Sequence, residues 1–376
     1  MYGSMREVIQ RIDWWIVAAL LPLFGLSLAT MSSFGGVNGS LLVRQALWIG
    51  VFLVVFFTVA SLDLSFIKVS RTLFLLYLFG IALLGSLFII GVTNKGATSW
   101  LDFGAFSFQP SDLIKLFLIL ILAKYLARRH VEIRAMKHVL ITALYFAIPF
   151  IFIFLQPDFG SAFVLFCIWF GMILVAGISK KHLLFFFVVG LGLFMVMWTF
   201  VFQEYQKDRI RSFVDPLSDV QGTGYNAYQS VIAVGSGQVF GKGVGYGTQS
   251  RLSFLPEYET DFIFAATGEE WGFIGSIIIL VLFAIIVFRI LKIGYQMNNN
   301  FELLFAVGIA FYIMSHILIN IGMNIGLMPV TGVTLPFMSY GGSHLLIEAL
   351  ALGMLMSFRK QSRSVYKDES PEVFLR

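Results

Sequence analysis

Long apolar runs most constrain what this chain can fold into. Ten of them follow one another, each near the roughly 20 residues that cross a bilayer as a helix. They lie at about 13–31, 42–61, 72–92, 111–126, 138–155, 159–177, 182–202, 262–288, 302–326 and 343–358. A membrane barrel would show short segments of alternating polarity instead. The sequence predicts an all-α integral membrane protein with about ten transmembrane helices.

Composition excludes an ordinary soluble domain. Hydrophobic residues make up 58% of the 376 residues and charged residues only 12%, whereas soluble chains carry about a quarter charged residues. We therefore expect residues 1–376 to form one polytopic membrane domain. The single cysteine, Cys167, lies in an apolar run and has no thiol partner for a disulfide or a metal site.

The basic residues predict the orientation. Most of the 26 lysines and arginines lie in the termini or the even-numbered loops, and cytoplasmic loops carry this excess. Both termini, with a tail at about 359–376, are predicted to be cytoplasmic. The long loop at about 203–261, between helices seven and eight, is predicted to be extracytoplasmic. The net charge of +5 fits contact with anionic membrane lipids and does not indicate nucleic acid.

One segment breaks the apolar pattern at membrane depth. NIGMNIGLMPVTGVTLPFMSYGGS, from Asn320 to Ser343, contains Pro329, Pro336 and several glycines between two apolar runs. Broken backbone at this depth is tolerated only where protein or a water-filled cavity satisfies its amide groups. The segment therefore predicts a built site, and the alternative is an ordinary kinked helix with a re-entrant loop.

A second polar segment, residues 91–115, joins helices three and four on the predicted outer face. Its Gln-Pro-Ser-Asp run is typical of a helix start with Ser111 as the N-cap. Asp112 and Lys115 are three apart and share one helix face. An unpaired charge in the membrane costs about 2.5–3.5 kcal/mol, so we expect them to pair. The pair either is purely structural or lines a working cavity.

Two further outer segments carry polar groups. In QPDFGS, Asp158 either caps helix six or contributes to a site. The long loop carries Arg209, Arg211 and, in GSGQVFGKGVGYGT, Lys242. This glycine-rich run fails as a Walker A loop. Its amides and the nearby cations can still hold a pyrophosphate, and contact with phospholipid headgroups is the alternative.

Acidic residues gather at the start of helix eight, in LPEYETDFIFAATGEEWGF. Repulsion among Glu257, Glu259 and Asp261 would raise at least one carboxyl pKa, as a general base working near neutral pH requires. Capping of the helix is the alternative for Asp261. Glu269 and Glu270 lie deeper, and we expect them to support the loop through hydrogen bonds.

Five of these segments resemble the SEDS family (shape, elongation, division and sporulation), which includes RodA and FtsW. The segment ending at Ser343 is similar to the family signature nearly residue for residue. Trp100 and QPSD resemble the family's Arg-Trp and Gln-Pro-Ser-Glu, and LPEYETDFIF resembles Leu-Pro-Glu-x-His-Thr-Asp-Phe-Ile-Phe. RIRSFVDP and GTQSRLSFLPE look like the RodA branch. Departures are Ser99 for Arg, Asp112 for Glu, Glu259 for His and His344 for Ser.

The resemblance implies a peptidoglycan glycosyltransferase in the bacterial cytoplasmic membrane that polymerises lipid II at its outer face during cell elongation. Asp261 falls on the family's catalytic aspartate and would be the general base, with undecaprenyl pyrophosphate as the leaving group. The residues assigned to substrate binding are Trp100, Asp112, Lys115, Asp158, Arg209, Arg211, Lys242 and Ser343. Those assigned to support are Glu257, Glu259, Glu269 and Glu270.

The identity of any metal stays open. Either the cations Lys115, Arg209, Arg211 and Lys242 or a divalent ion, Mg²⁺ or Mn²⁺, would stabilise the leaving group. The family works with a class B penicillin-binding protein, a transpeptidase. Two alternatives to the enzyme remain. The first is a lipid II flippase, because broken helices and buried charges suit transporters equally. The second is a non-catalytic scaffold. The position of the acids, near the outer surface rather than the midplane, favours the enzyme.

Overall fold

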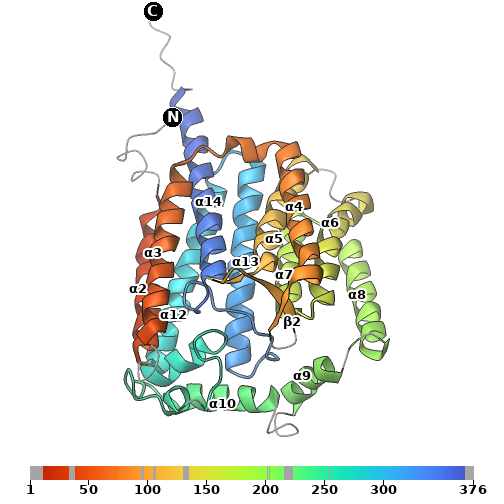
Figure 1. Ribbon diagram of the computed structural model, residues 1–376. Helices are drawn as coiled ribbons and strands as arrows, with labels where there is room; N and C mark the ends of the chain where they lie inside the picture. The colour runs from red at the N-terminus through yellow and green to blue at the C-terminus, as the bar shows by residue number, and fades with distance from the viewer. Residues whose placement is uncertain are drawn as a thin grey trace, which may run out of the picture.

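The structure is a computed structural model that describes residues 12–33, 39–94, 97–104, 107–129, 135–200, 202, 204–215, 223–252 and 254–368. Each predicted apolar run coincides with one long helix (Figure 1). These helices are α2 (Trp14–Ser33), α3 (Gly39–Ser61), α4 (Ser70–Ile90), α5 (Pro110–Arg129), α6 (Met136–Leu155), α7 (Phe159–Ala176), α8 (Lys180–Phe200), α12 (Ile263–Tyr295), α13 (Asn300–Asn324) and α14 (Gly342–Asp368).

Shorter elements fill the connections. They are η1 (Ser65–Lys68), β1 (Val92–Asn94), β2 (Ala97–Asp102), β3 (Ser107–Phe108), α9 (Glu204–Val214), α10 (Thr223–Ser236) and α11 (Thr248–Arg251). Among the described residues, eight helices are long and apolar enough to span a membrane. The prediction of an all-α, multi-pass membrane protein is confirmed, with a small sheet that the sequence did not predict.

Helix α13 lies at the centre of the bundle. It packs against α12, α7 and α5, while α14 packs along α3 and α12 along α2. Nearly all side chains of α13 are buried, including the polar His316, Asn320 and Asn324. Helix α8 lies at the periphery (Figure 1), and most of its apolar side chains are exposed. Polar groups therefore concentrate along α13, and the outer helices present apolar surface of the kind that suits lipid.

Ion pairs gather at one end of the bundle. Asp13, just before α2, pairs with Arg289 of α12 and, at 3.2 Å, with Arg359 of α14. Lys68 pairs with Glu302 at the start of α13. Helices α9 and α10 cross the opposite end (Figure 1). One end is therefore held by ion pairs between the ends of the long helices, and the other carries the long loops with ion pairs of their own.

The loop between α4 and α5 forms a three-stranded antiparallel sheet in the order β1-β2-β3. Trp100 of β2 pairs with Val92, and Leu101 pairs with Phe108 of β3. Helix α5 then begins at Pro110, so the prediction of Ser111 as N-cap is wrong by two residues. Proline is favoured at a first helical position because the missing N–H would have no helical partner there.

Candidate active site

A tight turn places Asp261 immediately before α12. Glu257 adopts a left-handed conformation (φ +53°), and its carbonyl accepts hydrogen bonds from the amides of Thr260, Asp261 and Phe262 at 3.1–3.2 Å. The N-cap position of α12 is Phe262. Asp261 therefore precedes the cap, which is not the arrangement expected if it served as the helix cap. Its side chain is half-buried.

Two asparagines of α13 hold the backbone of this turn. The Nδ2 atoms of Asn320 and Asn324 both donate to the carbonyl of Asp261, at 2.9 and 3.0 Å. Asn324 Oδ1 accepts from the amide of Ala265 at 2.9 Å, and Asn320 also donates to Val333 O at 2.7 Å. Because these amides are buried and uncharged, they fix the backbone of Asp261 without supplying an opposite charge to its carboxylate.

The broken segment between α13 and α14 covers the same turn. Tyr340 N donates to Glu259 O at 2.8 Å, and Ser339 Oγ donates to Thr260 O at 2.6 Å. A Cβ placed on Gly332 would lie 3.5 Å from Asp261 Oδ2, so this segment passes beside the carboxylate. The irregular backbone is satisfied by protein groups, as expected from its place in the membrane.

The acids and aromatic of the turn have different surroundings. Glu257 Oε2 accepts from Thr260 Oγ1 at 3.2 Å. Tyr258 packs on a small core made by Ala233, Leu255, Phe262 and Ala265. Burial raises the pKa of the Tyr258 phenol, and the neighbouring Glu259 and Glu257 carboxylates raise it further. The phenol therefore stays neutral at physiological pH and can donate a hydrogen bond.

A second cluster surrounds the start of α5. Lys115 Nζ lies 2.9 Å from Asp112 Oδ1 and 3.3 Å from Ser161 Oγ, and both charged side chains are buried. The predicted ion pair is confirmed. Asp158 caps α7 by accepting from Ser161 N at 3.0 Å, and its other oxygen accepts from Gln109 Nε2 at 3.1 Å. Asp158 thus caps a helix and also contacts the start of α5.

The α13–α14 segment connects the two clusters. A Cβ on Gly160 would lie 2.9 Å from Thr331 O, so this segment presses on the start of α7 close to where it passes Asp261. Ser343 Oγ accepts from the amide of Gln109 at 3.0 Å. The structure therefore brings Asp112, Lys115, Asp158 and Ser343 together. Trp100 is half-buried on β2, which contacts α5.

Glu269 organises the glycine-rich loop. Its carboxylate accepts from Lys242 Nζ at 2.8 Å, from Thr248 N at 2.7 Å and from Gln249 N at 3.1 Å. Glu270 accepts from Gly245 N at 3.0 Å. Lys242 is therefore already engaged by a buried carboxylate, which makes it a less available phosphate ligand than the sequence suggested.

Gly272 lets α12 bend around this loop, a feature that the sequence analysis missed. Its φ of +68° interrupts the helix. The amide of Phe273 donates to Gln238 O at 2.8 Å, and the amide of Lys242 donates to Glu269 O at 3.0 Å. A Cβ on Gly241 would lie 2.1 Å from Glu270 O, so only glycine permits this approach. The neighbouring glycines and glutamates at the start of this helix are the sequence signal from which the bend could have been predicted.

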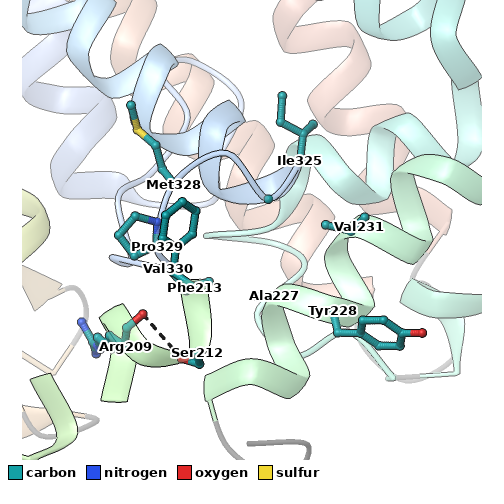
Figure 2. A pocket seen from close by; sticks show the side chains of 11 residues that line it. Arg209, Ser212, Phe213, Ala227, Tyr228, Val231, Ile325, Met328, Pro329 and Val330 are labelled. Carbon is teal, nitrogen blue, oxygen red and sulfur yellow. Dashed lines mark hydrogen bonds between the residues drawn. The ribbon is translucent and has the colours of Figure 1, made fainter. Parts of the chain in front are cut away.

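Arg209 and Arg211 lie in different settings although they share α9. Arg211 pairs with Asp208 at 3.0 Å on the exposed surface. Arg209 lines a cavity of about 240 Å³ between α9, α10 and the segment after α13 (Figure 2). The rest of the lining is mostly apolar, including Phe213, Val231 and Val330. Val330 also packs on the small core that contains Phe262, next to Asp261 in the chain.

Within the described ranges, one group of three residues brings metal-ligating atoms within 4.8 Å of one another: Asp112, His316 and His344. Glu257, Glu259 and Asp261 do not form such a group. An all-oxygen site for Mg²⁺ or Mn²⁺ is therefore not built by these three acids alone. Mg²⁺ is commonly held by one or two carboxylates together with substrate phosphates, and Asp261 and its neighbours are compatible with that arrangement.

Comparison with known proteins agrees with this architecture. Residues 7–364 match the family model FtsW/RodA/SpoVE, described as "Cell cycle protein". The chain is 38% identical to a probable peptidoglycan glycosyltransferase FtsW of Haemophilus influenzae, over 77% of this chain and 73% of the relative. It is 35% identical to the peptidoglycan glycosyltransferase MrdB, a RodA protein, of Escherichia coli, over 78% and 79%.

A solved peptidoglycan synthase complex, described as coordinating polymerization and crosslinking, contains a chain of the same fold. The two chains superpose with a TM-score of 0.80 at 28% identity, covering 93% of this chain and 98% of the other. The names of these relatives confirm the prediction that the chain is an enzyme. The chain belongs to the SEDS family, the family of FtsW, RodA and SpoVE, and to its RodA branch.

Proposed function

We propose that this peptidoglycan glycosyltransferase polymerises lipid II into glycan strands at the outer face of the bacterial cytoplasmic membrane during cell elongation. The observation that carries the proposal is the Asp261 turn. A half-buried carboxylate precedes a helix, its backbone is fixed by two neutral amides, and a broken membrane segment passes beside it. A fixed acid next to irregular backbone is an arrangement suited to a substrate site.

In this proposal Asp261 is the general base. Its carboxylate takes the proton from the acceptor sugar hydroxyl while that oxygen bonds to the anomeric carbon of the donor. The bond from that carbon to the pyrophosphate oxygen breaks, and undecaprenyl pyrophosphate leaves with the electron pair. A positioned base of this kind contributes about 10²–10⁴-fold in rate.

Arg209 is the cation best suited to the leaving group. It stands at an otherwise mostly apolar cavity, which suits a molecule that joins a pyrophosphate to a prenyl chain. Lys115 pairs with Asp112, and Lys242 pairs with Glu269. These two lysines would therefore affect the site by positioning their partner carboxylates. A divalent ion, Mg²⁺ or Mn²⁺, would neutralise charge on the pyrophosphate, and the phosphate oxygens of the substrate would supply most of its ligands.

The substitution Asp261→Asn tests the base directly. It keeps the size of the side chain and removes the proton acceptor, so polymerisation of labelled lipid II by purified enzyme should fall about 10²–10⁴-fold. Thermal stability and retention of lipid II should stay near those of the parent. Asp208→Asn, which removes an exposed carboxylate on α9, is the matched control. Polymerisation at near the parent rate in Asp261→Asn would refute the mechanism.

The flippase alternative predicts a different result. A transporter needs no carboxylate for sugar chemistry, so Asp261→Asn vesicles would still move lipid II across the membrane. The parent protein would then make no glycan in a purified assay. Asp261 contacts Asn320 and Asn324 in the last turns of α13 rather than the middle of that helix, and this position near one end of the bundle supports the enzyme. A scaffold would leave glycan synthesis unchanged by this substitution in a reconstituted system.

The proposed orientation puts both chain termini in the cytoplasm and the Asp261 turn outside. The ion-paired end of the bundle, with Arg289, Arg359 and Lys68, would then be cytoplasmic, in accord with the positive-inside rule. In a Cys167→Ala background, an impermeant thiol reagent should label Tyr246→Cys but not Lys180→Cys in intact cells. Equal labelling at both positions would contradict this orientation.

A class B penicillin-binding protein is the proposed partner. The solved synthase complex, which couples polymerization with crosslinking, supports a transpeptidase beside a chain of this fold. The apolar side chains of Phe273, Ile277 and Val281 are exposed on α12 and offer a surface for a membrane helix. Bulky polar substitutions there should abolish copurification with the transpeptidase, and unchanged copurification would place the contact elsewhere.

A further inference from the structure

Two histidines and an aspartate meet inside the bundle, beside the Asp112–Lys115 pair. Asp112 comes from α5, His316 from α13 and His344 from α14, and all three are at least nine-tenths buried. Each offers one ligand atom, and these atoms lie within 4.8 Å of one another. The two imidazole rings are 4.8 Å apart between centroids. Three helices thus bring a two-histidine, one-carboxylate set to one point.

The hydrogen bonds around each ring leave one nitrogen of each directed at this point. His316 Nδ1 lies 3.2 Å from Thr334 O, which can only accept, so this nitrogen carries the proton. His316 Nε2 then has a lone pair, and it is buried with no hydrogen-bond partner. A buried lone pair without a donor is costly unless a cation or a water meets it.

His344 differs from His316 in that both of its ring nitrogens face side chains. Its Nε2 lies 2.8 Å from Glu348 Oε1, at ion-pair distance though poorly aligned for a hydrogen bond. Its Nδ1 faces Asp112 Oδ2 at 3.5 Å, and the hydroxyl of Tyr312 stands equally far away. When the ring proton is on Nε2, towards Glu348, Nδ1 carries a lone pair, and this lone pair and the carboxylate oxygen of Asp112 repel each other unless a positive species lies between them. Glu348 plays the part of the carboxylate behind a metal-binding histidine.

We propose that Asp112 Oδ2, His316 Nε2 and His344 Nδ1 bind one transition-metal dication of the Zn²⁺ type. Imidazole nitrogen with a single carboxylate suits Zn²⁺ and its neighbours and not Mg²⁺ or Ca²⁺, which prefer all-oxygen sites. Tetrahedral ligands at about 2.1 Å lie about 3.4 Å apart, so the donors draw together on binding. The ion joins α5, α13 and α14 and positions Asp112 against Lys115.

Charge at the site is compatible with a dication. Lys115 Nζ contacts Asp112 Oδ1 and Ser161, which leaves Oδ2 for the metal. The positive charge of the Lys115 ammonium disfavours binding of a metal cation nearby. Asp112 and the nearby Glu348 supply two negative charges that favour it. An imidazolium at His344 is the competing arrangement, and it would pair with both carboxylates without any metal. The test below separates the two.

The experiment uses full-length protein purified in detergent without a polyhistidine tag. Titration with Co²⁺ should give one equivalent bound and the visible absorption bands of a four-coordinate site, and Zn²⁺ should displace them. His316→Gln and His344→Gln should each lower affinity at least 10-fold. His182→Gln, on peripheral α8, is the matched control and should bind normally.

The unaltered protein alone can refute the proposal. Absence of the cobalt bands, or fewer than about 0.1 equivalents of Co²⁺ or Zn²⁺ retained after gel filtration, means that the imidazolium arrangement holds. Unchanged binding in His316→Gln would show that the ion sits elsewhere. Metal content is measured without lipid II, so this result stands apart from the test of Asp261.

Discussion

The Asp261 turn and the Asp112 cluster manage acidic groups in opposite ways. Asp261 is half-buried, and the groups that fix it, Asn320 and Asn324, act on its backbone and carry no charge. Asp112 is buried, and its carboxylate is held directly by Lys115 and faces His344. The backbone of Asp261 is thus held by neutral amides, whereas the carboxylate of Asp112 is held by an ammonium group. The first arrangement suits the proton transfer proposed for Asp261, and the second favours a carboxylate that stays charged.

The largest expected effect is a difference in stability between variants of the two aspartates. Asp112→Asn leaves the Lys115 ammonium buried without its partner, and such losses cost about 3–5 kcal/mol. Asp261→Asn keeps the backbone contacts of the turn and should destabilise the protein less than Asp112→Asn does. Thermal unfolding in detergent measures both. Equal destabilisation by the two substitutions would contradict the view that the carboxylate of Asp112 is held by an ion pair and that Asp261 is held through its backbone.

A double-mutant cycle sharpens this contrast. Lys115→Met should destabilise the protein by an amount similar to Asp112→Asn, and the double variant should lose less than the sum. Both substitutions remove the same interaction, so their effects cannot add. Additive losses in folded yield and unfolding temperature would show that the pair contributes nothing as a pair.

The next effect concerns the asparagine clamp. Asn320→Ala removes the donor to Asp261 O and to Val333 O, and unsatisfied buried carbonyls cost about 1–3 kcal/mol. Because the backbone of Asp261, the proposed general base, is then held less firmly, turnover should fall more than apparent lipid II affinity. Gln296→Ala, at the far end of α12, serves as the control. Unchanged turnover would mean that Asn324 alone suffices to hold the turn.

The smallest effects separate the basic residues of the long loop. Lys242→Met removes one of several donors to Glu269 and should destabilise the protein by about 1 kcal/mol. Arg211→Gln breaks the exposed pair with Asp208, which is worth about 0–1 kcal/mol. Arg209→Gln should leave stability unchanged yet lower polymerisation, as measured with labelled lipid II. Loss of activity in Arg211→Gln but not in Arg209→Gln would reverse the assignment.

Several features were determined by the sequence itself. Runs of about 20 apolar residues can be satisfied in a bilayer only as helices, because no water is present to bond their backbone. The ten helices therefore lie where hydropathy put them. The i, i+3 spacing of Asp112 and Lys115 was enough to predict their pairing, since neighbours on one helix face meet without help from other elements.

Tertiary structure alone decided the rest. Asn324 and Asp261 are 63 residues apart, and His316 joins Asp112 only when α13 packs on α5. The bend at Gly272 depends on a loop that arrives from residues 237–243. Such contacts link residues distant in sequence, and hydropathy and spacing report only on neighbours along the chain. Hence the sequence could indicate Asp261, but only packing could show what holds it.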